Sequence, residues 1–408
     1  MSDSLRRLVH VTGVDWHAVS GANQMLRRVL ATPGCLEGYA QEVLSLKMPA
    51  QRFAEGLDSP KVRCREGRHV GGLELPRRPA CLRRWRVWWS LRAARPDVVL
   101  TWSWKSGRVL AAGRRSGVAG YPALLREAGD MWSSGRNHPD AYQRVLRAHQ
   151  GIVCNSRAAR DCLVQDWGVK PERVAVVPNP LPPSLLTEAA PGPRRQAGVA
   201  VGVAGRFVDI KGIPLAIHAV RSLREQGVPA RLEIAGSGSR EQALWSLVER
   251  EGLEGCCRFW GRLGDMRPFY DALDVLLVPS VFESFGNVAM EAQARGCPVV
   301  AAAVGGLPDT LAVGRSGYLV EPTLPLSAYR RLSGHAWGEG EKGLQQLAAK
   351  AEDFKLVDPE ALADAAQRIV QDPGVHQSFR QGAVDHVRAH FQMDAYCRQM
   401  RELMDALV

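Results

Sequence analysis

The chain has 408 residues, more than one hydrophobic core usually supports, so two domains are expected. Its 46% hydrophobic and 23% charged residues are ordinary for a soluble globular protein. The formal net charge is +11, and residues 1–190 hold 29 Lys and Arg against 16 Asp and Glu, whereas residues 191–408 hold 24 against 26. The basic first half therefore favours an anionic partner, such as membrane headgroups, a phosphorylated acceptor or nucleic acid.

Membrane spans and disulfides are not expected from the sequence. No apolar run reaches the roughly 18 residues that a membrane-spanning helix needs. The N-terminal residues MSDSLRRLVHVTG lack the apolar length and cleavage site of a signal peptide, so a cytoplasmic location is expected. The nine cysteines are scattered without a C-x-x-C pair or a nearby His cluster, which favours reduced, buried thiols over a disulfide framework or a zinc site.

Short β-rich runs alternate with helical patterns through the first half. The expected strands are 8–11, 43–46, 98–101, 123–126, 151–154 and 174–177, and the expected helices include 23–30 and 157–167. Such alternation predicts a parallel sheet with helices on both faces.

The stretch Cys81–Leu91 interleaves Trp and Arg along a possible helix. Such a helix suits an anionic membrane surface. It equally suits a domain helix that buries its Trp face and exposes its Arg face, and the sequence leaves both interpretations open.

A Pro-rich stretch, 178–197, interrupts the alternation and is interpreted as an interdomain linker. A second alternation follows. Its expected strands are 199–204, 230–234, 258–260, 275–279 and 298–301, and its expected helices are 213–226, 240–251 and 287–295. Residues 323–357 are interpreted as a mobile excursion or lid, and the last helices as 359–371, 375–390 and 393–407.

The predicted fold class is α/β, with two facing Rossmann-like, doubly wound domains and a cleft between them. The first domain is expected to span 1–185, with 393–408 packing back on it, and the second to span 196–392. Open sheets of this kind bind ligands outside the carboxyl ends of their strands.

The segment Pro279–Ala292 carries the strongest chemical signal. It follows a buried strand and opens a helix, so backbone N–H groups near Gly286 and Asn287 form an anion site. Glu283 lies in the loop and Glu291 in the helix, which suits hydroxyls at opposite ends of one ligand. Taken alone, Glu291 is equally explained as a helix-start carboxylate with no ligand.

The pattern Phe282-Glu283-x7-Glu291, followed by Gly296-x-Pro298 and Gly305-Gly306, resembles glycosyltransferase family four. Gly205-Arg206 with Lys211-Gly212, and Gly314-x-x-Gly317, resemble further parts of that family. In the first half, Asn155-Ser156 and Val176–Asn179 resemble its strand ends. The resemblance covers most of the chain, is most specific in the second half, and implies the GT-B fold.

The resemblance also implies roles for single residues. Arg206 and Lys211 would hold the donor diphosphate, and Glu283 would hold hydroxyls of the transferred sugar. Glu291 would accept both ribose hydroxyls. The other implied donor-binding residues are Gly205, Arg262 after the strand at 258–260, and Phe285, Gly286, Asn287 and Val288 through their amides. No D-x-D pattern is visible, so side-chain cations rather than a metal would neutralise the leaving group.

The first half departs from the family. It keeps one glycine, Gly21, where the family has a Gly-Gly loop, with Asn23 expected to cap the following helix. The expected His near the reacting sugar is absent, and Asp130 is the candidate acceptor-side carboxylate, with loop capping as the competing interpretation. Residues 15–17, Asp-Trp-His, are weaker acceptor candidates.

The family implies a retaining, metal-independent hexosyltransferase that uses a nucleoside diphosphate sugar, UDP-linked by expectation, and no cofactor. An anionic glycan or glycolipid acceptor is expected at the inner face of the bacterial membrane, first of all the lipopolysaccharide core. Exopolysaccharide or glycolipid synthesis and an inactive donor-binding scaffold are alternatives. A nucleic-acid-binding protein is disfavoured, because no such motif accompanies the charge.

Overall fold

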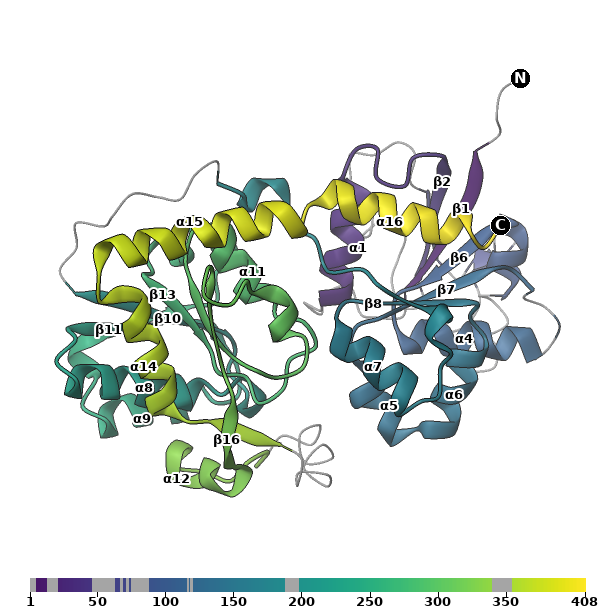
Figure 1. Cartoon of the computed structure of the whole chain (residues 1–408). Helices are drawn as coiled ribbons and strands as arrows, with labels where there is room; N and C mark the ends of the chain where they lie inside the picture. The colour runs from purple at the N-terminus through teal and green to yellow at the C-terminus, as the bar shows by residue number, and fades with distance from the viewer. Residues whose placement is uncertain are drawn as a thin grey trace. The chain divides into compact units, whose positions relative to one another are not determined.

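The computed structural model describes residues 5–12, 21–45, 63–66, 69–70, 73–74, 88–115, 117, 120–187, 198–339 and 354–408. The chain divides into two compact units (Figure 1). The first unit is Met1–Pro180 with Met393–Val408, and the second is Leu181–Gln392.

The first unit is built on a seven-stranded sheet in the order β3-β2-β1-β6-β7-β8-β9. Every neighbouring pair is parallel. Its strands are β1 (Arg6–Thr12), β2 (Tyr39–Ser45), β3 (Arg63–Glu66), β6 (Val98–Thr101), β7 (Ala123–Glu127), β8 (Gly151–Cys154) and β9 (Val174–Val176). A separate antiparallel pair joins β4 (His69–Val70) to β5 (Leu73–Glu74).

Helices cover both faces of this sheet, because alternate strand residues point to opposite sides. Leu8 packs with α1 (Gly21–Ala31) and the C-terminal helix α16 (Met393–Asp405), whereas Val9 packs with α4 (Trp104–Arg115). Figure 1 shows α1 and α16 on one side of the sheet and the helices α4 to α7 on the other. The remaining helices of that side are α5 (Ser134–Asn137), α6 (Pro139–Arg147) and α7 (Arg157–Gln165).

The second unit has a six-stranded parallel sheet in the order β12-β11-β10-β13-β14-β15. Its strands are β10 (Val199–Arg206), β11 (Ala230–Ser237), β12 (Cys257–Gly261), β13 (Val275–Val278), β14 (Val299–Ala302) and β15 (Gly317–Val320). Its helices are α8 (Ile213–Glu225), α9 (Glu241–Arg250), α10 (Arg267–Asp271), α11 (Asn287–Ala294), α12 (Tyr329–Ser333), α14 (Pro359–Val370) and α15 (Pro373–His390). The two sheets confirm the predicted pair of doubly wound α/β units.

The cysteine expectation is wrong for one pair. Cys35, after α1, forms a disulfide with Cys397 of α16, across a sequence separation of 362 residues. No spacing pattern in the sequence predicts this bond, because only the packing of α16 beside α1 brings the two thiols together. Of the other cysteines that the structure describes, Cys154 and Cys162 are buried free thiols.

The expectation of a mobile excursion at 323–357 is wrong for its described parts. Residues 322–325 (β16) pair with 355–357 (β17), and α12 follows β16. Tyr329 and Gly338 bind the buried carboxylate of Asp209, so this segment is anchored to the second unit. Residues 340–353 lie outside the described part of the chain.

One smaller expectation is wrong, and another is tested only in part. Helix α1 begins at Gly21, so Asn23 is its third residue and not its cap. The Trp- and Arg-rich stretch is described only from residue 88, where residues 88–94 are helical. There Trp88 donates to the carbonyl of Val109 while Trp89 is 46% exposed, so the Trp side chains divide between core and surface.

Candidate functional site

In the second sheet, the order in which successive strands are added reverses between β10 and β13. These neighbouring strands connect through α8 and α11 to strands on opposite sides, which makes their carboxyl ends the topological switch point where open α/β sheets bind ligands. The two loops that leave this point are joined by a hydrogen bond from the Val281 amide to the Ile210 carbonyl, 2.9 Å. The predicted donor residues Lys211 and Glu283 lie on these loops, and Arg206 is the last residue of β10.

Lys211 and Glu283 are brought into direct contact. The Lys211 ammonium donates to the Glu283 carboxylate in an ion pair, and the two side chains are 20% and 14% exposed. The aliphatic part of Lys211 lies over Gly205, where an added Cβ would stand 3.5 Å from Lys211 Cγ. Both groups are therefore fixed at the sheet edge while part of each still reaches solvent.

The loop that carries Glu283 is shaped by two glycines with positive φ. Gly286, at φ +104°, leads into α11. Gly305, at φ +52°, passes so close that an added Cβ would meet the Glu283 carbonyl oxygen at 1.9 Å. The Gly306 amide donates to that same carbonyl, 2.9 Å, so a second loop holds the backbone of Glu283. Non-glycine residues are disfavoured at both positions by strain and by contact.

The start of α11 supplies backbone donors. The first N–H groups of a helix point out of its end and favour an anion, and here they belong to Asn287 and Val288. The Phe285 side chain is buried against Phe391, so any ligand contact of Phe285 falls to its backbone. Further along the helix, Glu291 accepts a hydrogen bond from the buried Tyr270 hydroxyl, 3.0 Å, which orients its carboxylate.

The remaining donor candidates lie at the same edge of the sheet. Arg206 ends β10, and its side chain is exposed without an ion pair to another described residue. Arg262 follows β12, the edge strand, which is separated from β10 by β11, and it is exposed too. The structure thus pairs Lys211 with Glu283 and leaves Arg206 and Arg262 directed to solvent.

Sequence reasoning missed Asp209, which lies between Arg206 and Lys211. Its fully buried carboxylate accepts two hydrogen bonds from Arg240, at 2.7 and 2.8 Å, and others from His335 and the Gly338 amide. Burial opposes ionisation, but the bonds from His335 and Arg240 outweigh it and lower the pKa of Asp209. The only sequence signal was an acid inside a basic loop, since its partners are 31 to 129 residues away.

The carboxylate of Asp130, in the first unit, accepts a hydrogen bond from the protein backbone. Its carboxylate accepts from the amide of Trp104, the first residue of α4, 3.1 Å. Its neighbour Glu127 is fully buried and accepts from the amides of Gly129 and Asp130 and from the Tyr142 hydroxyl. Burial and the adjacent Asp130 charge raise the pKa of Glu127 to about 7, and burial raises the pKa of Asp130 as well.

The other first-unit candidates are less informative. Gly21 starts α1, and residues 15–17 lie outside the described part of the chain. In the described ranges, no group of three or more His, Cys, Asp or Glu side chains is arranged to hold a metal ion. No described helix is long and apolar enough to cross a membrane.

The two units form a fold of the GT-B type, and comparisons with known proteins agree. The family described as "Glycosyl transferase 4-like domain" matches residues 20–180, and the family "Glycosyl transferases group 1" matches residues 198–332. The chain belongs to glycosyltransferase family four, as its motifs predict.

Curated relatives carry the name D-inositol 3-phosphate glycosyltransferase. The one from Actinosynnema mirum is 30% identical over 321 residues, which are 72% of this chain and 68% of that relative. The one from Corynebacterium kroppenstedtii is 33% identical over 200 residues, and the match covers 44% of each protein, under half of the relative's length.

Solved structures show the same fold at low identity. HepE from Anabaena, crystallised with UDP, superposes with a TM-score of 0.73 at 18% identity, covering 98% of this chain and all of that one. WaaG, a glycosyltransferase of lipopolysaccharide biosynthesis, superposes with a TM-score of 0.65 at 14% identity, covering 98% and 99% of the two chains.

Proposed function

We propose that this chain transfers a hexose from a nucleoside diphosphate sugar to an acceptor hydroxyl and retains the configuration at the anomeric carbon. The observation that carries the proposal is the Lys211–Glu283 pair at the switch point of the second sheet, beside Arg206 and the start of α11. A cation, a carboxylate and helix-end amides at one edge match the phosphates and hydroxyls of such a donor. The HepE complexes with UDP and UDP-glucose support a UDP-linked hexose.

In this mechanism the bond between the anomeric carbon and the diphosphate breaks, and the acceptor oxygen attacks from the same face without a protein nucleophile. The acceptor hydroxyl gives its proton to an oxygen of the departing diphosphate. Arg206 and Lys211 stabilise the charge on the departing diphosphate, while Glu283 holds sugar hydroxyls and Glu291 the ribose. Because two side-chain cations face the leaving group, transfer is proposed to need no metal and to persist in a chelator.

The proposed acceptor is anionic and phosphorylated. The basic first half supports this class, and the lipopolysaccharide core is its first proposed form, with exopolysaccharide and glycolipid acceptors as alternatives. The names of the curated relatives favour a second form, a phosphorylated cyclitol such as D-inositol 3-phosphate. The two forms share a phosphate group.

A donor screen followed by product analysis tests the proposal. Thermal unfolding across nucleotide sugars should single out one donor, because a ligand at 100 times its dissociation constant stabilises by about 2.7 kcal/mol. That donor is then incubated with the phosphorylated lipopolysaccharide core, with D-inositol 3-phosphate and with unphosphorylated controls, and the anomeric configuration of the product is read by NMR. An inverted product contradicts the mechanism, and donor binding without nucleotide release on any acceptor favours the inactive scaffold.

A further inference from the structure

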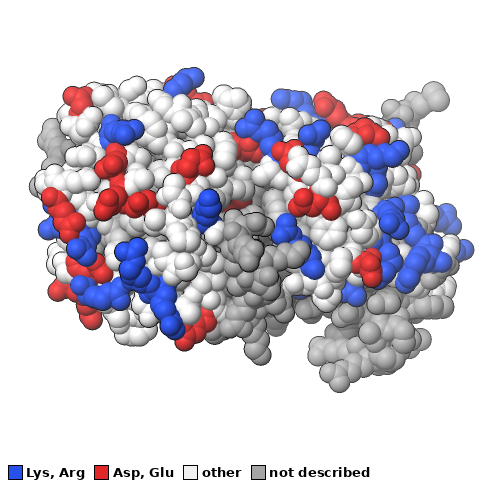
Figure 2. Space-filling model, turned by 60° about the horizontal axis from the view of Figure 1, so that its bottom comes forward, with Lys and Arg blue, Asp and Glu red and all other residues white. Residues whose placement is uncertain are grey.

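Helices α4 and α6, which lie on one face of the first sheet, carry a surplus of basic residues. Helix α4 (WKSGRVLAAGRR) has four basic residues and no acidic one, and α6 (PDAYQRVLR) adds Arg144 and Arg147 against Asp140. Figure 2 shows Lys and Arg side chains gathered on part of the molecular face that it presents. Charge of one sign on adjacent helices attracts anions.

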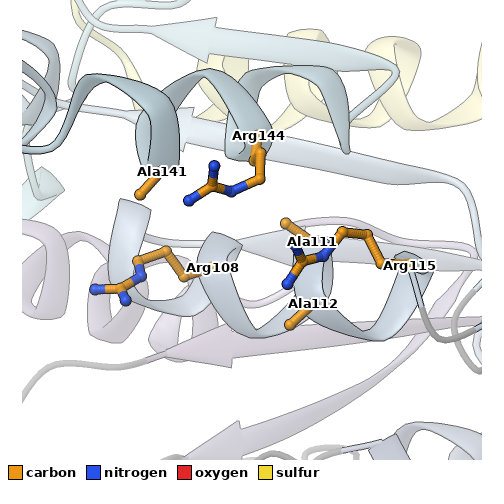
Figure 3. A pocket seen from close by; sticks show the side chains of 6 residues that line it. All are labelled: Arg108, Ala111, Ala112, Arg115, Ala141 and Arg144. Atoms are coloured by element: carbon orange, nitrogen blue, oxygen red, sulfur yellow. The ribbon is translucent and has the colours of Figure 1, made fainter.

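A pocket of about 70 Å³ lies between these helices, and we call it the arginine pocket (Figure 3). Its lining residues are Arg108, Ala111, Ala112, Arg115, Ala141 and Arg144. Arg108 and Arg115 are seven residues apart, two helical turns, so they share one face of α4. The small alanines between them and on α6 leave the hollow that larger side chains would fill, and Figure 3 shows the three arginines around it.

The three guanidinium groups are available to a ligand. All three arginines are exposed, and none forms an ion pair with another described residue. Asp140 lies one turn before Arg144 but makes no ion pair with it in the described part of the chain. Arg114, by contrast, is committed to the Tyr121 carbonyl at 2.6 Å and does not line the pocket.

One guanidinium is held in position before any ligand arrives. Arg108 lies over the Trp104 ring, 4.8 Å from its centroid, and Trp104 is itself buried and stacked on His138. A cation over an indole is stabilised where it stands. Binding a ligand through Arg108 therefore costs less side-chain conformational entropy, because Trp104 already holds the guanidinium in place.

We propose that the arginine pocket binds a phosphate group, as a site separate from the donor site. Guanidinium groups match phosphate oxygens with paired hydrogen bonds, and several of them around one hollow favour a multiply charged anion over chloride. The phosphate can belong to a soluble phosphorylated molecule or to a lipid headgroup, since both present the same oxygens. The site does not depend on the proposed transfer reaction, because no residue of the donor site lines it.

The test uses the full chain and three variants. R108Q/R115Q/R144Q removes the pocket charges, and Ala112→Leu fills the hollow without changing charge. The matched control, R92Q/R160Q/R398Q, removes three arginine charges elsewhere on the first unit. Each protein is titrated calorimetrically with inorganic phosphate and sedimented with vesicles of phosphatidylglycerol and phosphatidylcholine or of phosphatidylcholine alone. Phosphate bound at the donor site is common to all four proteins and cancels in the comparison.

The pocket triple variant and Ala112→Leu should each weaken phosphate binding at least tenfold, while the control changes it less than twofold. Vesicle binding that needs phosphatidylglycerol and falls in the same two variants assigns the phosphate to a lipid headgroup, for which each basic residue contributes roughly fivefold. Phosphate binding without vesicle binding assigns it to a soluble molecule. Equal weakening in the pocket and control variants, or no change in either, overturns the proposal.

Discussion

Lys211 and Glu283 are 72 residues apart in the sequence and meet at the edge of the second sheet. Because each side chain holds the other, we expect them to act on a donor as one unit, with the ammonium toward phosphate and the carboxylate toward hydroxyls. Such a pair would couple diphosphate binding, predicted for Lys211, to binding of the sugar hydroxyls, predicted for Glu283.

A double-mutant cycle measures this coupling. Lys211→Ala and Glu283→Gln should each weaken donor binding, and the double variant should lose less than the sum of the two losses, with a coupling energy of about 0.5–3 kcal/mol. The donor dissociation constant of all four proteins gives the value. Strict additivity would show that the pair does not act together on the donor.

Glu127 should make the stability of the protein depend on pH in a characteristic direction. Its pKa in the folded chain is about 7, against 4.5 as the ordinary value, so the folded state binds more protons than the unfolded state between these limits. Stability from this group therefore falls as pH rises from about 4.5 to about 7 and is constant above.

Glu127→Gln should remove this fall in stability with rising pH. The amide oxygen can still accept from Gly129 and Asp130, and the amide N–H can donate to the Tyr142 hydroxyl, so the fold should be kept. Urea unfolding at pH 5, 6, 7 and 8 should show the variant gaining stability relative to the wild type as pH rises. The exposed Glu172→Gln is the control, and parallel pH profiles for Glu127→Gln would refute the assignment.

At the scale of elements, the loop with Glu283 depends on the close approach of the Gly305 loop. Gly305→Ala should destabilise the protein and weaken donor binding, because the added Cβ meets the Glu283 carbonyl at 1.9 Å. Gly314→Ala is the matched control, since Gly314 also has a positive φ, +76°, but nothing within 4 Å of the added Cβ.

The strain of positive φ is common to both substitutions, so their difference reports the contact alone. Chemical denaturation should place Gly305→Ala about 1–3 kcal/mol below Gly314→Ala, the usual cost of overpacking. Equal losses would mean that the Gly305 loop moves aside freely and does not fix Glu283.

Helices and strands could be predicted from the sequence where local residue patterns agree with the packing of the folded chain. Strands β6 and β8 have the predicted bounds, since short runs of apolar and β-branched residues favour buried strands. Helices α4 and α6 were not predicted, and α4 contains two glycines and a serine that disfavour a helix. The packing of α4 against Leu125 and Val145 outweighs this low helix propensity. That packing exists only in the folded chain.

The candidate site shows the same difference between what local sequence patterns predict and what only packing supplies. Glu283, Gly286 and Glu291 could be predicted as site residues because their spacing is local, along one loop and helix. The Asp209 network and the Tyr270 contact to Glu291 were missed, because their partners come from other elements. Spacing in one sequence carries no information on such distant pairs.

At the scale of the whole molecule, the disulfide between Cys35 and Cys397 joins the two ends of the chain within the first unit. A cross-link that closes so long a loop restricts the unfolded chain, and typical stabilisation is about 2–4 kcal/mol. Cys397→Ser, or a reductant added to the wild type, should lower the unfolding midpoint, whereas Cys256→Ser should not. Peptide mapping without reduction checks the bond, and finding Cys35 alkylated would contradict it.

We propose that the carboxyl edge of the second sheet is the donor-phosphate site. The rate of hexose transfer by Arg206→Ala, compared with wild type and with the exposed Arg267→Ala of the same unit, tests it most directly. Loss of one charged contact to the leaving group should lower kcat about 100- to 1,000-fold, with Arg267→Ala near the wild-type rate. Unchanged turnover of Arg206→Ala with the correct donor would contradict the account.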